Sequence, residues 1–367
     1  MNDRAEAPSI LRESAVIVFV NSVAGGGRAR SYLAQIQKLF ESFQVHAQFV
    51  MTSSAGELES SAQNAISQGQ RVLFALGGDG TFQALANAAF GAEALLGVLP
   101  VGGGNDFAAA LGLPDDPVKA AEAILRGNQR FVDLVRVRTA EGRTRLYAGG
   151  GGIGLDAEAA RYASGAYRWL PGRFRYIASA LRALVGYVPI EVRIDFPGTE
   201  LISWEAKALL AAVLNSPTYG AGLRLAPGAT LDDASLHVIL IADINTFGVL
   251  RLLPRLIGSG DFQTSLLKRW RVSKVRLTTR KPSLFHGDGE ILGPTPVEIE
   301  VVPRAVRVLA PARFSTDSRA VLWACRLRLA PSPRLWPGPF PCGGGKGPSR
   351  NPDKILSRYC RRCCRQD

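Results

Sequence analysis

The chain has 367 residues, of which 47% are hydrophobic and 8% aromatic, so it can build folded cores and is too apolar to be disordered throughout. Its formal net charge is +13, but 12 of its 44 Lys and Arg residues and only three of its 31 Asp and Glu residues follow residue 310. The first 310 residues thus carry 32 positive against 28 negative charges, which gives no support for nucleic-acid binding by the body of the protein.

The sequence contains no apolar run of the roughly 20 residues that a membrane-spanning helix needs. The N-terminal segment MNDRAEAPSILRES contains acids and lacks the long apolar core of a secretory signal, so we expect a cytoplasmic protein. From residue 313 onwards the chain is basic, rich in Pro, Gly and Arg, and holds all five cysteines. We expect this tail, residues 313–367, to be poorly ordered and to take no part in the function.

Strand and helix patterns alternate in the first third of the chain. Alternation of this kind is typical of a mainly parallel sheet covered by helices in three layers, with ligands bound at the carboxyl ends of the strands. We therefore predict an α/β domain over residues 12–135. The predicted strands are Ala15–Val20, Val45–Met51, Arg71–Leu76 and Leu95–Pro100, and the predicted helices cover Arg28–Phe43, Ala55–Gln68 and the residues after Thr81.

The pattern changes near residue 131, after which strand-like runs dominate and Gly, Pro and Asp separate them. Such punctuation is typical of antiparallel strands, so we predict a β-rich, sandwich-like second domain over residues 136–312. Two helices are expected to interrupt it, over Arg173–Tyr187 and Thr246–Ile257. The strand-like runs are residues 131–138, 144–150, 191–196, 207–215, 235–242, 271–279 and 297–310.

Three predicted strands of the first domain end in a glycine-rich loop: NSVAGGG at 21–27, GGDGT at 77–81 and VGGGND at 101–106. Glycines let backbone N–H groups approach phosphate oxygens closely, and the helices that follow add the positive ends of their dipoles. One glycine pair after a strand is more often a simple turn, but three such loops at one sheet edge favour a polyphosphate site. Asp79 and Asp106 lie in these loops, and an acid beside phosphates needs an intervening cation. The residues therefore predict a Mg²⁺–nucleotide site.

A dinucleotide site of the Rossmann type is the natural rival of this interpretation. It needs the spacing G-x-G-x-x-G directly after the first strand. Gly25, Gly26 and Gly27 are consecutive and are followed by Arg28, so the required spacing is missing.

Six segments taken together resemble the diacylglycerol kinase catalytic-domain family, which includes bacterial lipid kinases, sphingosine kinases and ceramide kinases. GGDGT alone would be weak, because phosphofructokinases and NAD kinases share this type of loop, but the set occurs in the family's order over residues 15–310. The resemblance implies a nucleotide-binding domain, a β-rich lid domain and an active site between them. The segments are NSVAGGGRA (21–29), GGDGT (77–81), LPVGGGNDFAAALGLP (99–114), VDLVRV (132–137), GGGIGLDAEA (150–159) and FHGDGE (285–290).

The resemblance also implies which residues bind ATP and Mg²⁺ and which act on the acceptor. Asp79 would lie near the catalytic Mg²⁺, and either Asp288 or Glu290 would supply the general base that takes the proton of the acceptor hydroxyl. Asp288 and Gly289 also form a strong type I′ hairpin-turn signal, which is compatible with that role. The residues expected to contact the nucleotide are Asn21, Ser22, Gly25, Gly26, Thr52, Gly77, Gly78, Asp79, Gly80, Thr81, Gly102, Gly103, Gly104, Asn105 and Asp106.

A structural Mg²⁺ in the second domain is a further feature that the resemblance implies. The corresponding run here is APGATLDDASLHV, in which Asp233 would be the ligating acid, and Thr230 and Ser235 would offer main-chain oxygens. The family has glycine where this chain has Ala234, and alanine would be strained there if the position needs a positive φ.

Two other positions depart from the family's pattern. Gln83 and Ala84 stand where the family has Asn and Glu, and Gly103 lacks the hydroxyl of the family's Thr or Ser. Losing these groups could lower activity, so a degenerate nucleotide- or lipid-binding protein remains an alternative. Asp79 and both candidate bases are present, which favours catalysis.

We therefore expect an ATP- and Mg²⁺-dependent kinase that phosphorylates a lipid hydroxyl, most simply converting diacylglycerol to phosphatidate in phospholipid metabolism. The alternative enzymes are a sphingoid-base, ceramide or NAD kinase. The lipid would be met at a membrane surface, where the basic amphipathic stretches 172–187 and 249–258 could bind, although an apolar helix face more often packs on its own core. The sequence is compatible with a homodimer and leaves the oligomeric state open.

Overall fold

The computed structural model describes residues 7–164, 178–180, 182–185, 187–220, 222–260 and 264–312. All of them belong to one compact unit of the chain, Met1–Phe314. The predicted tail with its cysteines, and part of the predicted helix Arg173–Tyr187, lie outside the described residues.

Four parallel strands form the sheet at the amino-terminal end of this unit. They are β1 (Val16–Asn21), β2 (Ala47–Thr52), β3 (Val72–Gly77) and β4 (Leu95–Pro100), in the order β2-β1-β3-β4. The residues of β3 and β4 are buried throughout, as expected for strands covered on both faces. The four predicted strands are therefore confirmed, with bounds shifted by at most two residues.

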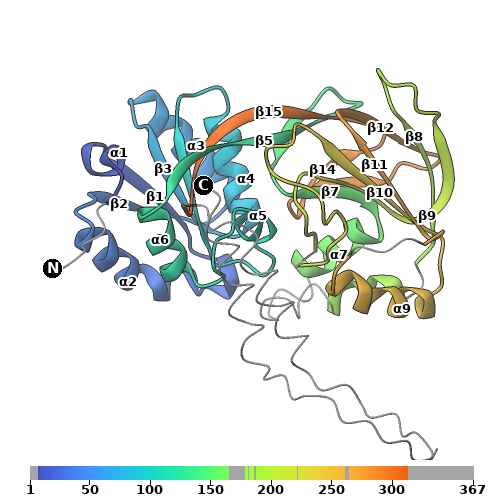
Figure 1. Ribbon diagram of the computed structural model, residues 1–367, viewed down its shortest axis with the longest axis horizontal. Coiled ribbons are helices and arrows are strands. Elements are labelled where there is room, and N and C mark those ends of the chain that lie inside the picture. Colours follow the sequence, from blue (N-terminus) through green and yellow to red (C-terminus); the bar gives the residue numbers. More distant parts are fainter. Residues whose placement is uncertain are drawn as a thin grey trace, which may run out of the picture. The chain divides into compact units, whose positions relative to one another are not determined.

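Helices cover both faces of this parallel sheet (Figure 1). α2 (Ala29–Ser42) packs beside α6 (Pro117–Leu125) on one face, and α3 (Ala55–Ser67) packs beside α4 (Asp79–Ala89) on the other. The inward-facing side chains of these helices join the strands in one hydrophobic core. This is the predicted three-layer α/β architecture. The short helices α1 (Ser9–Glu13) and α5 (Asp106–Ala110) complete this lobe.

Side-chain caps explain where two of these helices begin. Ser54 precedes α3 and accepts the N–H of Glu57 at 3.1 Å. Asp116 precedes α6 and accepts the N–H groups of Val118 and Lys119 at 3.0 and 2.9 Å. The helices that follow the second and third glycine loops, α4 and α5, have no side-chain cap, so the first turn of each is left to other partners.

The other strands form an antiparallel, β-rich lobe, which confirms the predicted class of the second domain. Two helices, α7 (Leu155–Ser164) and α9 (Thr246–Ile257), pack on β9 and β10 in a core of their own. The strands are β5 (Asn128–Thr139), β6 (Thr144–Tyr147), β7 (Gly150–Gly154), β8 (Ile190–Asp195), β9 (Trp204–Leu214), β10 (Leu236–Ala242), β11 (Leu267–Val272), β12 (Lys274–Thr279), β13 (Leu284–Gly287), β14 (Glu290–Pro294) and β15 (Val297–Ala310).

The predicted strand-like run 271–279 is two strands in the structure. β11 ends at Val272 and pairs with β10, whereas β12 begins at Lys274 and pairs with β8 and β15. The chain thus changes partners at Ser273, which periodicity alone does not reveal. The predicted helix Thr246–Ile257 is confirmed as α9.

The glycine-rich strand β7 was not expected, because glycine disfavours strands. β7 lies between β9 and β13, and its neighbours approach closely. A Cβ atom on Gly151 would lie 2.4 Å from the carbonyl oxygen of His286, and a Cβ atom on Gly150 would lie 2.7 Å from the side chain of Leu214. Glycine is therefore required here so that the β13–β14 hairpin can reach the sheet.

β5 and β15 run through both lobes and join them (Figure 1). The start of β15 pairs with β12, while Arg307 and Val308 near its end pair with β4 of the parallel sheet. β5 is paired with β15 along most of its length. The boundary predicted between residues 135 and 136 lies inside β5, although each lobe keeps a core of its own.

The buried carboxylate of Asp133 on β5 stabilises the region where β5 passes from one lobe to the other. Asp133 is 1% exposed, and its two oxygens accept the N–H groups of Ala234 and Arg304, each at 2.7 Å. Both Ala234 and Arg304 have a positive φ, 53° and 50°, which is unfavourable for residues other than glycine. The carboxylate therefore holds two strained backbone positions in place.

We predict that Asp133→Asn lowers the free energy of unfolding by about 2–3 kcal/mol, because an amide can accept only one of the two buried N–H bonds. Urea unfolding monitored by circular dichroism measures this value. Asp232→Asn is the control, since the ion pair of Asp232 with Arg130 is partly exposed and should contribute less than about 1 kcal/mol. Equal stability losses in the two variants would contradict the role given to Asp133.

Candidate active site

The tips of β1, β3 and β4 meet at one edge of the parallel sheet. The Asn21 side chain donates to the Thr81 hydroxyl at 3.0 Å, which connects the first glycine loop to the GGDGT loop. The N–H of Val101 donates to the carbonyl of Gly77 at 2.8 Å, which connects the GGDGT loop to the third loop. A Cβ atom on Gly25 would lie 2.3 Å from the carbonyl oxygen of Val101, so the first and third loops also touch. The structure thus brings the three predicted loops together.

The tip of β2 supports this edge through backbone contacts. Ser22 donates both its N–H and its hydroxyl to the carbonyl oxygen of Thr52, at 2.9 and 3.0 Å. Thr52 is only 2% exposed, and its hydroxyl donates to the carbonyl of Val20 at 3.3 Å. The structure therefore places Thr52 behind the loops, with its side chain engaged in the fold.

Several predicted glycines are required because their neighbours leave no room for a Cβ atom. A Cβ atom on Gly77 would lie 2.2 Å from the Thr81 hydroxyl, and one on Gly102 would lie 2.6 Å from the Cα atom of Gly78. Gly26 and Gly80 have more room: nothing lies within 4 Å of a Cβ atom on Gly26, and the nearest atom to one on Gly80 is 3.6 Å away. Gly77 and Gly102 thus allow the close packing of the loops, whereas Gly26 and Gly80 leave free space beside the backbone.

Asn105 is buried in the third loop with a left-handed backbone, φ 56°. Its Nδ2 donates to the carbonyl of Gly102 at 3.2 Å. Within the described part of the chain its Oδ1 receives no hydrogen bond, which is unusual for a buried side-chain oxygen. Gly103 and Gly104 precede Asn105, and Gly104 lines the cavity described below.

Asp79 begins α4, and its carboxylate accepts the N–H groups of Asp106 and Phe107, at 3.3 and 3.1 Å, at the start of α5. Burial, and then the nearby carboxylates of Asp106 and Asp288, raise the pKa of Asp79 to about 7, although the two N–H bonds oppose this. The Asp79 carboxylate therefore lies among like charges in a partly desolvated position.

Asp288 reaches this place from the second lobe, at the tip of the β13–β14 hairpin. Asp288 and Gly289 have φ values of 49° and 87°, which confirms the predicted turn with two positive φ angles. The Asp288 carboxylate accepts the N–H groups of Ala148, Gly149 and Gly150, at 2.7, 3.0 and 3.0 Å. Burial raises the pKa of Asp288 to about 6, against the lowering effect of these three bonds.

Glu290, the second candidate base, lies at the start of β14 near the amino end of α4. Its Oε1 would be 3.6 Å from a Cβ atom on Gly80. Burial raises the pKa of Glu290, while Arg145 lowers it. Arg145 itself forms a two-bond pair with Glu59 of α3, at 2.7 and 2.8 Å. The hairpin tip therefore rests on the first turn of α4, and its two acids point to different neighbours.

A cavity of about 180 Å³ extends from the acids into the second lobe. Asp79, Asp106 and Asp288 line one end, and the rest is lined mainly by apolar side chains from α7, β9, β10 and α9, among them Leu155, Leu209, Ile241 and Leu252. Sequence analysis did not find this cavity, because its lining comes from separate elements with no motif in common. Leu252 and Leu256 of α9 are buried against it, so this helix packs its apolar side on its own core.

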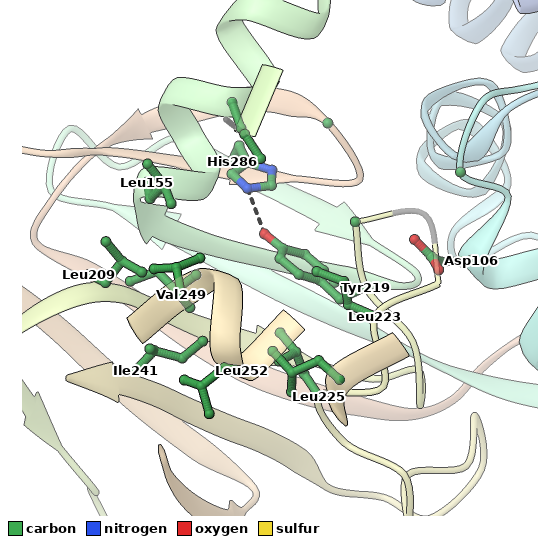
Figure 2. Close-up of a pocket in the computed structure, with 18 of the residues that line it drawn as sticks. Asp106, Leu155, Leu209, Tyr219, Leu223, Leu225, Ile241, Val249, Leu252 and His286 are labelled. Carbon is green, nitrogen blue, oxygen red and sulfur yellow. Dashed lines mark hydrogen bonds between the residues drawn. The ribbon is translucent and has the colours of Figure 1, made fainter. Parts of the chain in front are cut away.

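Tyr219 and His286 add a polar pair to the wall of this cavity (Figure 2). The Tyr219 hydroxyl and His286 Nε2 are 2.7 Å apart, and the residues are only 8% and 5% exposed. Asp106 lies on the other side of Tyr219 from Leu155 and Leu209 in this view and accepts the N–H of Gly222 at 3.1 Å. Asp106, predicted to lie in a phosphate loop, therefore also binds Gly222 of the second lobe.

Gln83 and Ala84 are fully buried within α4. Gln83 Nε2 donates to the carbonyl of Leu146 at 3.1 Å, and Ala84 belongs to the core of the first lobe. A carboxylate at position 84 would therefore be buried in that core. Because position 84 does not line the cavity described above, alanine there does not reduce the number of acids in the cavity wall.

The residues around Asp79 fit a divalent cation. Three carboxylates crowd one another there, two of them with raised pKa values, and a cation would relieve this repulsion. Each oxygen of Asp79 accepts one N–H bond and retains lone-pair capacity for a metal or its water.

The residues around Asp233 do not fit a divalent cation. The carboxylate contacts His237 Nε2 at 3.0 Å and the guanidinium of Arg271 at 3.7 Å. Arg271 also donates to the carbonyl of Asp233 and to the hydroxyl of Ser235, at 3.2 and 2.9 Å, and the carbonyl of Thr230 receives the N–H of Asp233 at 3.4 Å. The guanidinium thus supplies the positive charge at this turn. Ala234 has a positive φ of 53°, which is the condition under which alanine is strained at this position.

Comparisons with known proteins agree with this architecture. Residues 15–137 match the model of the diacylglycerol kinase catalytic domain, and residues 151–310 match that of the YegS C-terminal NAD kinase beta sandwich-like domain. A protein of Xanthomonas euvesicatoria pv. vesicatoria (strain 85-10) named "Probable lipid kinase YegS-like" is 30% identical over 271 residues, covering 71% of this chain and 85% of that protein.

Two further matches are named diacylglycerol kinases. A diacylglycerol kinase of Mycobacterium tuberculosis (strain ATCC 25618 / H37Rv) is 29% identical over 248 residues, covering 67% of this chain and 79% of that protein. The crystal structure of a diacylglycerol kinase from Bacillus anthracis str. Sterne has a TM-score of 0.61 at 20% identity, covering 81% of this chain and 97% of that one. This structural likeness concerns the fold. In the described part of the chain, none of the helices has the length and apolarity needed to cross a bilayer.

We predict that Asp79→Asn stabilises the ligand-free protein at pH 8 and that the gain disappears near pH 4. The folded-state pKa of Asp79, about 7, lies above its ordinary value of 3.8, so ionisation of Asp79 costs stability as pH rises between these values. The amide removes this cost, which is on the order of 1–3 kcal/mol. Thermal unfolding of both proteins at pH 4 and pH 8 measures the difference.

Asp195→Asn is the matched control with the opposite sign. Although burial raises the pKa of Asp195, hydrogen bonds from Ser203 and Arg193 bring it below the ordinary value. Neutralising it should therefore destabilise the protein at pH 8. An Asp79→Asn variant that is less stable than the wild type at pH 8 would contradict the electrostatic account of the site.

Proposed function

The chain belongs to the diacylglycerol kinase catalytic-domain family and is a lipid kinase; on that premise we propose that it transfers the γ-phosphoryl group of ATP to a hydroxyl group of diacylglycerol, with Mg²⁺ as cofactor. The observation that carries the acceptor assignment is the shared cavity: Asp79 and Asp288 line the same space as the leucines of α9 and β9. A lipid could place its hydroxyl beside the acids and its chain among the leucines. The nicotinamide nucleotide of an NAD kinase offers no apolar chain for that end.

We assign the nucleotide to the glycine loops on three grounds. Their backbones approach one another closely, the helix α4 begins there without a side-chain cap, and Asn105 Oδ1 lacks a donor within the described residues. Helix N-termini of this kind attract phosphate groups. Asp79 would hold Mg²⁺ at the phosphates, and the ion would neutralise their charge as the γ-phosphoryl group moves.

Of the two candidate bases, the geometry favours Asp288. Asp288 lines the cavity, whereas Glu290 lies beside Gly80 and Arg145. Its three N–H bonds fix the orientation of the carboxylate and leave lone-pair capacity for the proton of a bound hydroxyl. With a pKa of about 6 it is ionised at neutral pH and can accept the proton of a bound hydroxyl. Glu290 is then a neighbour that supports the hairpin tip.

We predict that Asp288→Asn lowers kcat by about 10²–10⁴-fold, because this is the usual contribution of a positioned general base. Asp79→Asn should reduce transfer at least as strongly, whereas Glu290→Gln should cost less than about tenfold. The assay uses purified protein, labelled ATP and diacylglycerol in mixed micelles, with products separated by chromatography. Transfer at the wild-type rate by Asp288→Asn, with Glu290→Gln inactive, would exchange the roles of the two acids.

The pH dependence of kcat/KM provides a separate prediction, because it reports groups of the free enzyme. Asp288 must be ionised to act as the base, and its pKa is about 6. Mg²⁺ held by Asp79 would lower the pKa of Asp79 from its metal-free value of about 7, so we expect kcat/KM at saturating Mg²⁺ to fall as pH drops below about 6. Glu290→Gln should retain this profile. A rate that stays constant from pH 8 to pH 5 would exclude Asp288 as the base.

A further inference from the structure

We propose that Asn215 is a positioning residue for phosphoryl transfer: it holds the bend at residues 148–149, whose N–H groups in turn orient the carboxylate of Asp288. This inference rests on the proposed function, in which Asp288 is the general base. Asn215 directly follows β9, does not line the cavity, and lies outside the six segments that carry the family resemblance. Its role would therefore be exerted through Asp288 and not through contact with a substrate.

The bend at residues 148–149 connects β6 to β7 and lies between their ladders. The N–H groups of Ala148, Gly149 and Gly150 all donate to the carboxylate of Asp288, as described above. Two of these three residues are glycines, so the segment has little intrinsic preference for one conformation. The bend can hold the carboxylate in one orientation only if other contacts fix its backbone.

Asn215 supplies such contacts on the carbonyl side of the bend. Its Nδ2 donates to the carbonyl of Ala148 at 2.9 Å, and its backbone N–H donates to the carbonyl of Gly149 at 2.8 Å. The N–H of Ser216 donates to the same carbonyl of Gly149 at 3.1 Å. The bend is thus held by Asn215 and Ser216 through its carbonyl groups, and it holds Asp288 through its N–H groups.

The second hydrogen of the Asn215 amide fixes the orientation of this side chain. Nδ2 also donates to the main-chain carbonyl of Asp133 on β5, at 3.0 Å. Both partners of Nδ2 are carbonyl oxygens, which can only accept, so the opposite orientation of the amide would place its oxygen against two other oxygens. The Asn215 side chain therefore connects the bend to β5, the strand that runs through both lobes.

The burial of Asn215 indicates that its donor group matters more than its packing. The residue is 0% exposed, and its Oδ1 receives no hydrogen bond from any residue that the structure describes. A buried acceptor without a donor costs stability, which an apolar side chain of similar size would avoid. The two bonds that Nδ2 donates distinguish asparagine from leucine at this position, and one of them ends on the bend that holds Asp288.

The test is a double-mutant cycle between Asn215 and Asp288. Asn215→Ala removes both donors of the amide, and we expect it to lower kcat about ten- to a hundredfold, because a loosely held carboxylate is less often within reach of the hydroxyl proton. In the Asp288→Asn background the same change should lower kcat by less than about twofold, since the base that it positions is absent. The KM for ATP should change by less than about twofold.

Asp133→Asn is the matched control. It weakens the buried bonds to the N–H groups of Ala234 and Arg304, and it leaves in place the main-chain carbonyl that Asn215 binds. We expect this variant to lose stability and to keep the wild-type kcat at a temperature at which it is fully folded. Asn215→Ser is a milder substitution that retains a hydroxyl, and it takes the place of Asn215→Ala in the cycle if the alanine variant does not fold.

Amide hydrogen exchange, followed by NMR on the ligand-free full-length protein, gives a readout that needs no catalysis. In the wild type we expect the N–H groups of residues 148–150 to be protected, because the Asp288 carboxylate binds all three. Asn215→Ala should make these three amides exchange at least about tenfold faster than in the wild type. Asp133→Asn should leave their exchange relative to the amides of β9 unchanged.

The outcomes separate this inference from the proposed function. The inference would be overturned by an unchanged kcat in Asn215→Ala, by an equal loss of kcat in both backgrounds, or by wild-type exchange rates at residues 148–150 in that variant, even if transfer to lipid is efficient. Faster exchange at these residues in Asn215→Ala alone would support the holding role even if no lipid is phosphorylated, in which case the proposed function would fail instead. Unprotected amides at residues 148–150 in the wild type would overturn the inference whichever variants fold.

Discussion

The hydrogen bonding of the Asp288 carboxylate is the interaction on which the site depends. Three consecutive N–H groups, at residues 148–150, hold this carboxylate and thereby fix the tip of the β13–β14 hairpin against the edge of β7. Because β7 consists largely of glycine, the hairpin backbone can approach it closely and extend to Gly80 at the start of α4. An acid of the second lobe and the glycine loops of the first lobe thus come to share one cavity.

The same arrangement brings the carboxylates of Asp79, Asp106 and Asp288 together at one end of the cavity. Burial and the carboxylates of Asp106 and Asp288 raise the pKa of Asp79, burial raises the pKa of Asp288, and α4 starts without a side-chain cap. Such a combination is unfavourable for the ligand-free fold and is typical of sites that bind a cation and an anion together. The turn at Asp233 provides a contrast, since there Arg271 and His237 already balance the acid and the cluster serves the fold.

Sequence reasoning identified the elements whose local pattern is strong. Buried strands that end in glycine, helices with clear periodicity, and the Asp288–Gly289 turn all follow from short-range rules. What it missed depends on long-range packing: β7 is a strand only because its neighbours leave no room for a Cβ atom, and β5 and β15 cross the predicted boundary because they pair along both lobes. The residues of the apolar cavity and of the Tyr219–His286 pair come from elements far apart in the chain, so no sequence motif predicts them.

The central claim is that Asp79 and Asp288, supplied by different lobes, face each other across one site. The most direct test is to measure the pKa of Asp79 by carbon-detected NMR of the ligand-free protein, in the wild type and in Asp288→Asn. Because the Asp288 carboxylate raises the pKa of Asp79, the account predicts that the pKa of Asp79 falls in the variant. An unchanged pKa in a variant that is still folded would show that the two acids do not interact, and would contradict the account.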